Sequence, residues 1–501
     1  MLRVPLLLLL RSIGLLTLSG CQGTPSVPAE DRPPPLLLIS IDGFRHDYWD
    51  LAEIPALNRL VDGGLKADSL LHGFPTKTFP THYTLVTGRY PGTHGVVANS
   101  MWDPPRDARF SLRDRDAVGD GYWYSGGEPI WVTAENQGLR AGTFFWPGSE
   151  ARIHGVRPSY WKPYSNDVPH RERVDTILEW LDKPAAERPT LLTLYFSAVD
   201  SMGHRHGPRA EPVRDALIDI DEHLEILFDE LQERDLFDNM HIIVVSDHGM
   251  SWVDFDRYIM LDEYLDLGKV RVSDWGPAAQ IWATDMPAEE IVEALDGAHP
   301  HMRVWAREDV PARYRFGSHH RVPDVVAEAD LEWMISNRPH MAGRRQFSLY
   351  GMHGWDPALH EMHGGFVAHG PAFAAGSRSP AVRAVDLYAL MTHLLELEPA
   401  DHEGTLASFT PYLHAGRAIT VEQREYDCGG DSLTVQIGPA HAALHWDQFV
   451  HVLDRVESGN GERFEEMDLL FETSGDGARA EIDGRTLDSC RLVPAEAMTG
   501  R

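Results

Sequence analysis

Three short, uninterrupted apolar runs constrain the fold of this 501-residue chain more than any other feature of its sequence. They are LLLISI at 36–41, LLTLYF at 191–196 and IIVV at 242–245. Runs of this length are typical of strands buried on both faces of a parallel sheet. Between them, residues 213–231 place apolar side chains at three- and four-residue spacing, which predicts an amphipathic helix. Strands that alternate with helices indicate a doubly wound α/β sheet with helices on both faces.

Acidic residues closely follow these runs. Asp42 comes directly after the first run, Asp200 follows the second, and Asp247 follows the third with His248 beside it. In a doubly wound sheet the carboxyl ends of the strands line the ligand crevice, so we expect Asp42 and Asp247 to lie there. Asp200 and His204 are four residues apart, a spacing that puts both side chains on one side of a helical turn.

Seven residues at predicted strand ends and loop tips could carry chemistry. They are Asp42, Thr78, Asp200, His204, Asp247, His248 and His353. Carboxylates and imidazoles together suit Zn²⁺, which accepts both and keeps an open position in catalytic sites. Ordinary structural interpretations stay open, because a histidine is more often a surface or hydrogen-bonded residue and an Asp at a strand end often caps a helix. Composition and spacing alone therefore leave a metallohydrolase as one hypothesis among several.

The charge balance excludes one class of function. A net charge of −31 argues against binding of a nucleic-acid polymer, which requires clustered Lys and Arg. Part of this charge lies in the C-terminal segment, where short stretches such as LTVQI at 433–437 alternate between polar and apolar residues. Gly-rich turns separate these stretches. The pattern predicts a small antiparallel β domain at about 418–495.

The N-terminal residues are typical of an export signal. Residues 1–20 combine an early Arg3 with leucine-rich stretches, and LSGC at 18–21 has the form of a bacterial lipobox. That form implies cleavage before Cys21 and acylation of its thiol; an ordinary signal peptide or a membrane helix with a buried Cys21 are the alternatives. Residues 21–35 are rich in proline and are expected to form a tether. The expected location is a bacterial cell envelope, with the protein lipid-anchored, facing the periplasm and favouring the outer membrane.

Several further motifs occur in an order that a known family shares. They are IDGFR at 41–45, FPTKTFPTHY at 74–83, HGVVAN at 94–99, GEPIW at 127–131, FWPGS at 145–149, DSMGH at 200–204, SDHGM at 246–250 and HG at 353–354. Together they resemble the nucleotide pyrophosphatase/phosphodiesterase family of the alkaline phosphatase superfamily. The resemblance covers about residues 36–413, the expected catalytic domain, and implies an alkaline-phosphatase-like mixed sheet.

This resemblance implies a centre of two Zn²⁺ ions. The implied ligands are Asp42, Thr78, Asp247 and His248 for one ion, and Asp200, His204 and His353 for the other. His363 also precedes a glycine, but residues 351–356 match the family's ligand segment and we choose His353.

Thr78 is the expected nucleophile. A hydroxyl is a poor nucleophile at neutral pH, and coordination to Zn²⁺ can lower the pKa of an alcohol as it does that of water. The resemblance implies a phosphothreonine intermediate, and it gives Asn99 the role of donating its amide to a phosphoryl oxygen. Thr81 departs from the family pattern, which usually has Asn there, and the consequence of that departure stays open.

The resemblance also implies a nucleotide as substrate. The positions that match the base-binding residues are Phe79, Leu112, Tyr164 and Tyr195. Stacking on aromatic rings tolerates every base, so we expect cleavage of many nucleotide phosphodiesters and pyrophosphates to nucleoside monophosphates. Core packing is the alternative for each aromatic residue. A phosphomonoesterase or a lipid-headgroup phosphodiesterase of the same superfamily also stays open, whereas the C/S-x-P-x-R motif of sulfatases is absent from the sequence.

The chain has three cysteines. With Cys21 assigned to lipid attachment, we expect Cys428 and Cys490 to pair in an oxidising compartment, with two buried free thiols as the alternative. The C-terminal segment also resembles bacterial envelope inhibitors of C-type lysozyme, through CGG at 428–430, RF at 463–464 and Cys490. That resemblance implies lysozyme as a partner. Ser474 stands where the inhibitory Lys of that family is expected, which leaves inhibition open.

Overall fold

The apolar runs form neighbouring strands at the centre of the main sheet. β1 (Leu36–Ile41) pairs in parallel with β8 (Leu191–Phe196) on one side and with β9 (His241–Val245) on the other. Alternate residues of β1 enter two hydrophobic clusters, with Leu38 in one and Ile39 in the other. The strand is therefore buried on both faces, which explains why its residues are apolar except for Ser40.

The computed structural model describes residues 27–317, 319–344, 350–414, 416–459 and 461–494. In this part of the chain the main sheet has eight strands in the order β19, β2, β18, β9, β1, β8, β6, β7. The outer strands are β19 (Ser377–Ser379), β2 (Gly64–Ala67), β18 (Phe366–His369), β6 (Ala141–Phe144) and β7 (Tyr160–Trp161). β18 runs antiparallel to both of its neighbours, so the sheet is mixed, and the predicted fold class is confirmed.

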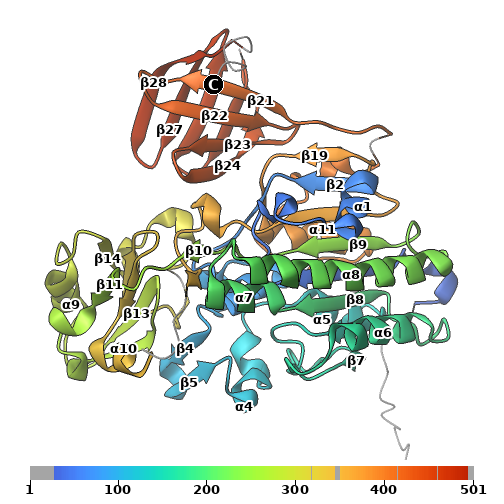
Figure 1. Cartoon of the computed structure of the whole chain (residues 1–501), viewed down its shortest axis with the longest axis horizontal. Helices are drawn as coiled ribbons and strands as arrows, with labels where there is room; N and C mark the ends of the chain where they lie inside the picture. Colours follow the sequence, from blue (N-terminus) through green and yellow to red (C-terminus); the bar gives the residue numbers. More distant parts are fainter. Residues whose placement is uncertain (1–26, 318, 345–349, 415, 460, 495–501) are drawn as a thin grey trace, which may run out of the picture.

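Helices cover both faces of this sheet. One face packs against α1 (Pro55–Gly63), α6 (His170–Leu181) and α8 (Glu211–Glu233). The other face packs against α2 (Thr78–Thr87), α5 (Ile130–Asn136) and α11 (Leu387–Leu394). Figure 1 shows α8 running along the sheet as its longest covering helix. α8 includes all of 213–231, so the helix predicted from apolar spacing is confirmed.

A second sheet interrupts the α/β order between β9 and β18. Its antiparallel strands are β12 (Val270–Asp274), β13 (Ala278–Ala283), β15 (Val325–Ala329) and β14 (Met302–Ala306), with α9 (Ala288–Leu295) in the same hydrophobic cluster. It lies at the left of Figure 1. The sequence motifs did not predict this sheet.

Short elements complete the expected catalytic domain, residues 36–413 (the catalytic part of the chain). The two-stranded ladders are β3 (Leu70–Leu71) with β20 (Val382–Arg383), β4 (Ser100–Asp103) with β5 (Ala108–Ser111), β10 (Ser251–Trp252) with β17 (Gly351–Met352), and β11 (Tyr258–Met260) with β16 (Met334–Ser336). The short helices are α3 (Pro91–His94), α4 (Arg115–Val118), α7 (Ala198–His206) and α10 (Arg338–Arg344). Among the helices of the described ranges, none combines the length and the apolar character that crossing a bilayer requires.

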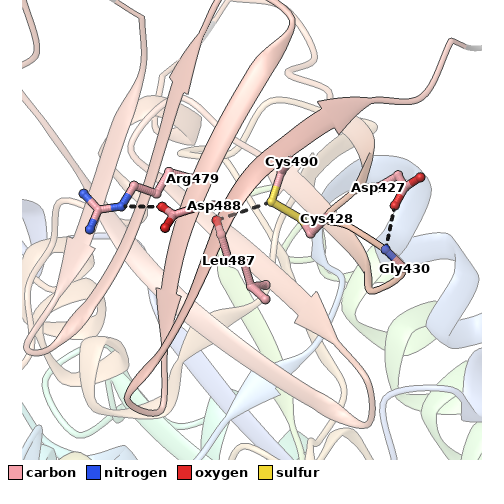
Figure 2. Close-up of a disulfide and its surroundings, with 7 residues drawn as sticks. All are labelled: Asp427, Cys428, Gly430, Arg479, Leu487, Asp488 and Cys490. Carbon is pink, nitrogen blue, oxygen red and sulfur yellow. Dashed lines mark hydrogen bonds and ion pairs between the residues drawn. A yellow bond between two sulfur atoms is a disulfide. The ribbon is translucent and has the colours of Figure 1, made fainter.

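The C-terminal segment folds as a closed antiparallel barrel (Figure 1). Its strands are β21 (Glu422–Asp427), β22 (Ser432–Ile437), β23 (His441–Trp446), β24 (Phe449–Val456), β25 (Arg463–Glu466), β26 (Leu469–Ser474), β27 (Gly477–Ile482) and β28 (Arg485–Leu492). β28 pairs with β21 and closes the barrel, and a disulfide joins Cys428 to Cys490 beside this closure (Figure 2). The alternating pattern thus predicted antiparallel strands but not their closure.

The barrel packs directly on the catalytic part of the chain. Leu359 and Phe449 form an antiparallel backbone bridge, and the Val450 N–H donates to the Ala358 carbonyl at 2.8 Å. Arg383, which is almost fully buried, reaches the carboxylates of Asp454 and Glu466 in the barrel. Backbone pairing and buried charge together therefore fix the barrel to the catalytic part.

Candidate functional site

The predicted metal ligands meet at the carboxyl end of the central strands. Asp42 follows β1, Asp247 and His248 follow β9, and Asp200 lies in the first turn of α7 after β8. The Asp200 N–H donates to the Asp42 carbonyl at 3.0 Å. This close approach depends on Gly43, which has φ +70° and where an added Cβ would lie 3.0 Å from the Asp200 Cα. The Asp-Gly pair at the end of β1 therefore serves the geometry of the site.

Carboxylate oxygens and imidazole nitrogens converge in two adjoining groups. His248 Nε2 lies 3.4 Å from Asp42 Oδ1 and 3.0 Å from Asp247 Oδ2. Asp200 Oδ1 lies 3.2 Å from His204 Nε2 and 3.7 Å from His353 Nε2. The rings of His248 and His353 stack with centroids 3.4 Å apart, so the two groups are contiguous. These are the two ligand sets that the sequence predicted, apart from Thr78.

The three imidazoles are oriented by backbone carbonyls. His204 Nδ1 lies 2.8 Å from the Gly351 carbonyl, His248 Nδ1 lies 2.8 Å from that of Gly249, and His353 Nδ1 lies 2.7 Å from that of Thr76. An imidazole whose Nδ1 donates to a carbonyl presents the lone pair of Nε2 to a metal. All three Nε2 atoms are thereby prepared as ligands.

The charges of the group call for a cation. Asp42 Oδ1, Asp200 Oδ1, Asp247 Oδ2 and His248 Nε2 are buried and have no hydrogen-bond partner among the described residues. Burial and the charges of Asp247 and Asp200 raise the pKa of Asp42 well above its usual range. Burial also raises the pKa of Asp200, but the charges of His204 and His353 outweigh it and hold the pKa at about 2. The residues present therefore fit divalent metal ions with mixed oxygen and nitrogen ligands.

Thr78 and Asn99 share a cavity with these ligands. Thr78 is the first residue of α2, and the cavity, of about 530 Å³, is also lined by Asp42, Asp200, His204 and His353. Asn99 Oδ1 accepts a hydrogen bond from the Phe79 N–H at 2.9 Å, which leaves the side-chain amide of Asn99 as a donor. The four residues assigned to base binding, Phe79, Leu112, Tyr164 and Tyr195, line the same cavity. The structure thus brings together the predicted nucleophile, ligands and substrate residues.

Tyr195 has a second contact that its assignment to base binding does not include. Its hydroxyl donates to Asp42 Oδ2 at 2.5 Å. The ring lines the cavity while the hydroxyl supports a predicted ligand. Its position on β8, next to the strand that carries Asp42, is the sequence signal that could have indicated this contact.

Two further groups were given no role in the sequence analysis, although Lys77 and His82 lie within the motif at 74–83. His82 Nδ1 lies 3.3 Å from Asp247 Oδ2 and 2.8 Å from the Thr78 carbonyl, so it connects a predicted ligand to the nucleophile's helix. Lys77 pairs with Asp274 at 2.5 Å on the cavity wall. His82 lies one helical turn after Thr78, and this spacing could have indicated its contact with the Thr78 carbonyl. Asp274 comes from the second sheet and has no such signal.

His363 lies apart from the ligand groups. Its Nδ1 contacts the Ser69 hydroxyl at 2.8 Å, and its ring packs near His360 and His46. The preference for His353 over His363 in the ligand set therefore agrees with the positions of the two rings.

A family model described as type I phosphodiesterase / nucleotide pyrophosphatase matches residues 36–356, which include every predicted metal ligand. The chain belongs to this family. The matched region ends before the barrel, so the likeness of the barrel to lysozyme inhibitors stays a prediction.

Animal proteins of the same family resemble the chain. Ectonucleotide pyrophosphatase/phosphodiesterase family member 1 of mouse is 37% identical over 78% of this chain but over only 44% of its own length. The chain thus spans less than half of that relative. The bis(5′-adenosyl)-triphosphatase of cattle is 37% identical over 80% of this chain and 85% of its own length. The structure of murine family member 5, in an inactive threonine-to-alanine variant with AMP, superposes with a TM-score of 0.72 at 36% identity over 76% of this chain and 100% of that one.

These relatives correct the expected location. The sequence predicted a lipid-anchored protein of a bacterial envelope, facing the periplasm. The prediction is wrong, because the matching relatives are animal ectonucleotide pyrophosphatases/phosphodiesterases and not bacterial envelope lipoproteins. The location prediction depended on Cys21 and on the predicted signal at 1–20. Both lie outside the described residues.

Proposed function

We propose that the protein is a two-zinc hydrolase that cleaves nucleotide phosphodiesters and pyrophosphates and releases nucleoside monophosphates. The observation that carries this proposal is the convergence of buried carboxylates and oriented imidazoles on one cavity that also contains Thr78. Asp42, Thr78, Asp247 and His248 would hold one Zn²⁺, and Asp200, His204 and His353 the other. When bound, the two ions would lower the pKa of the Thr78 hydroxyl and neutralise charge on the phosphoryl group.

The chain's own residues then position the reaction. Thr78 begins α2, and the N-terminus of a helix favours an anionic phosphoryl group. The Thr78 oxygen, having lost its proton, attacks phosphorus, and the bond from phosphorus to the leaving alcohol or phosphate breaks in line as the bond to Thr78 forms. Water then hydrolyses the phosphothreonine, which releases the nucleoside monophosphate and restores the Thr78 hydroxyl. The Asn99 amide donates to a phosphoryl oxygen, which stabilises its growing charge. In support, murine family member 5 is inactive when one of its threonines is replaced by alanine.

A nucleotide fits the remainder of the cavity. Phe79, Leu112, Tyr164 and Tyr195 supply apolar and aromatic surface for a base. Arg113 and Arg115 line the same cavity, where Arg115 pairs with Glu150 and Arg113 adds positive charge. AMP bound to murine family member 5 and the diadenosine substrate named for the cattle relative support a nucleotide over a lipid headgroup.

Thr78→Ala tests the mechanism. We expect it to lower hydrolysis of thymidine 5′-p-nitrophenyl phosphate at least about 1,000-fold, because the variant lacks the nucleophile. Zinc content should fall only in part, because the six carboxylate and imidazole ligands remain. Thr410→Ala, at an exposed position, is the matched control and should keep full activity. Undiminished turnover by the Thr78 variant would refute the mechanism.

A substrate comparison tests the specificity. Faster hydrolysis of thymidine 5′-p-nitrophenyl phosphate than of p-nitrophenyl phosphate or p-nitrophenylphosphocholine supports the nucleotide diester. A preference for p-nitrophenyl phosphate would instead indicate a phosphomonoesterase, and a preference for the choline ester a lipid phosphodiesterase.

A further inference from the structure

A second group of histidine and aspartate side chains lies between the catalytic part and the barrel. Asp68 lies between β2 and β3, and His360 begins a short 3-10 turn, His360–Met362. His445 belongs to β23 of the barrel. The ligand atoms of these three residues all lie within 4.8 Å of one another. Two domains thus contribute to one cluster.

The three side chains converge without bonding to one another. Asp68 Oδ2 lies 4.0 Å from His360 Nε2 and 3.9 Å from His445 Nε2, which is too far for a hydrogen bond. All three atoms are inaccessible to solvent, and none has a hydrogen-bond partner within the described part of the chain. Three buried polar atoms therefore face one small space, and leaving them unsatisfied is costly.

Surrounding contacts hold this arrangement in place. Gln436 of β22 donates from Nε2 to Asp68 Oδ1 at 3.0 Å, which leaves Oδ2 turned to the histidines. The ring of His46 stacks on that of His360 at 3.6 Å, and the His360 N–H donates to the Gln448 carbonyl at 3.0 Å. Side chains and backbone of both domains thus orient the cluster.

Burial favours the neutral form of both imidazoles. Burial and the nearby His445 together lower the pKa of His360 to about 4. Burial likewise lowers the pKa of His445. A neutral imidazole with the proton on Nδ1 offers the lone pair of Nε2, the form in which histidine binds metals.

We propose that Asp68, His360 and His445 form a zinc site that joins the barrel to the catalytic part of the chain. Two imidazole nitrogens and one carboxylate oxygen make a set of three protein ligands that suits Zn²⁺, with water in the fourth position. Tetrahedral coordination at about 2.0–2.2 Å requires ligand atoms about 3.3–3.6 Å apart. The two Asp68 distances exceed this by a few tenths of an ångström and the two histidine nitrogens lie within 4.8 Å, so the three side chains would close slightly around the ion. Ligand atoms of the candidate catalytic centre are already 3.0–3.7 Å apart without a metal.

A cation satisfies this cluster better than a water molecule does. A water molecule donates two hydrogen bonds, whereas the carboxylate oxygen and the two Nε2 atoms are three acceptors when each imidazole carries its proton on Nδ1. A divalent ion contacts all three and also neutralises the Asp68 carboxylate.

The proposed ion would also support the catalytic centre indirectly. Residues beside His360 hold the segment that follows His248: the Gly249 N–H donates to the Met362 carbonyl at 2.9 Å, and the Met250 N–H donates to the Glu361 carbonyl at 3.0 Å. His360, Glu361 and Met362 belong to one turn, so an ion on His360 fixes that turn from the barrel side.

Metal counting on the full chain tests the proposal. After chelator treatment, reloading with ZnCl₂ and removal of excess, we expect His445→Gln to hold one zinc ion per chain fewer than the wild-type protein. His393→Gln, at an exposed position of α11, is the matched control and should hold the wild-type number. The test uses the difference in zinc content between the wild-type protein and His445→Gln. This difference does not depend on how many ions the candidate catalytic centre binds. Equal zinc content in the wild-type protein and His445→Gln would overturn the proposal.

A measurement on the wild-type protein avoids any effect of the substitution on folding. Anomalous diffraction at the zinc edge from crystals grown with ZnCl₂ should give a peak within bonding distance of Asp68 Oδ2, His360 Nε2 and His445 Nε2. An electron-density peak there without anomalous signal would indicate water alone, and either that result or an empty position would refute the site.

Discussion

At the scale of single residues, Tyr195 links the cavity wall to the metal ligands. Its hydroxyl donates to Asp42 Oδ2, while Asp42 Oδ1 lies 3.4 Å from His248 Nε2. A hydrogen bond on the distal oxygen of a ligand carboxylate fixes its orientation. The same residue can thus support a metal through its hydroxyl and a base through its ring.

Tyr195→Phe separates these two roles. We expect zinc affinity to fall about 10- to 100-fold, the usual effect of losing such a supporting contact, while the aromatic surface stays. Competitive zinc titration with a chelating dye measures it. Tyr164→Phe is the control, because the Tyr164 hydroxyl contacts Ser197 at 3.3 Å and Asn166 rather than a ligand. Equal zinc affinities of the Tyr195 variant and the wild-type protein would show that the contact is not needed.

The sequence predicted the site residues that directly follow buried strands. It did not predict the site residues that reach the cavity from a distant part of the chain. Asp42 and Asp247 directly follow apolar strands, and parallel strands bring such positions to one edge. Asp274 reaches the cavity from the second sheet, almost 200 residues after its partner Lys77. No local pattern records that contact, because it depends on how the two sheets pack.

At the scale of elements, the barrel depends on a short closing seam. Within the described ranges, β21 and β28 pair at Tyr426 with Leu492 and at Asp427 with Arg491, and the Val493 N–H donates to the Glu425 carbonyl at 2.8 Å just beyond them. The disulfide between Cys428 and Cys490 lies beside this seam, as Figure 2 shows. The bond therefore connects the first and last strands of the barrel where backbone pairing is sparse.

Replacing both cysteines by alanine should destabilise the barrel. The disulfide closes a segment with a sequence separation of 62, for which the chain-entropy model gives about 4 kcal/mol of unfolding free energy. Hydrogen exchange of the β21–β28 backbone in the wild-type protein and the double variant measures this loss. Hydrolysis of a nucleotide diester at 25 °C serves as the control and should be unchanged. Unaltered exchange would show that the seam is stable by itself.

The second sheet carries a buried carboxyl whose charge is unfavourable. Glu328 on β15 is fully buried and accepts a hydrogen bond from the Tyr314 hydroxyl at 2.8 Å. Burial raises the pKa of Glu328 to about 7, although the charge of Arg303 opposes this. The folded protein therefore keeps the proton over a pH range in which the unfolded chain, with a pKa of about 4.3, has lost it.

The sign of the resulting pH dependence follows from proton binding. Between about pH 4.3 and 7 the folded state binds more protons than the unfolded state, so stability falls as pH rises and levels off above 7. We expect the wild-type protein to lose on the order of 3 kcal/mol relative to Glu328→Gln over this range. Urea unfolding of both proteins at several pH values measures the difference. A difference independent of pH would show that Glu328 is already ionised at pH 5.

The elements themselves differ in how far local pattern determines them. The α8 helix follows from the spacing of its apolar residues, and β1 from its unbroken apolar run. The barrel strands alternate as expected, but closure needs the pairing of β21 with β28, which are far apart in sequence. The register of the barrel strands and the closure of the barrel depend on partners that are distant in sequence. A local sequence pattern therefore cannot predict them.

At the scale of the whole molecule, the net negative charge opposes binding of an anionic nucleotide, and the proposed zinc ions would counter it within the cavity. The net charge of −31 repels an anionic nucleotide, whereas Arg113 and Arg115 line the cavity together with the proposed zinc ligands. The local cations must therefore outweigh the general charge at short range, where screening by salt is weakest.

The barrel is held to the catalytic part by a buried arginine. Arg383 Nη1 lies 2.9 Å from Asp454 Oδ1, and Nη2 donates to the Val452 carbonyl at 2.8 Å and lies 3.1 Å from Glu466 Oε2. Arg315 also pairs with Glu466. Without Arg383, the partly exposed Asp454 would lose this partner, whereas Glu466 would keep its pairing with Arg315.

Arg383→Met should therefore weaken docking of the barrel more than folding of either part. We expect a loss of about 1.5–3 kcal/mol, the usual contribution of hydrogen bonds to charged groups, seen in calorimetry as a barrel transition that separates from the main one and moves to lower temperature. Arg424→Met is the matched control, because Arg424 pairs with Glu422 and Glu462 inside the barrel, and it should cost no more than about 1 kcal/mol. Should Arg383→Met unfold in one transition at the wild-type temperature, the backbone bridge between Leu359 and Phe449 and the packing around it would be sufficient to hold the barrel.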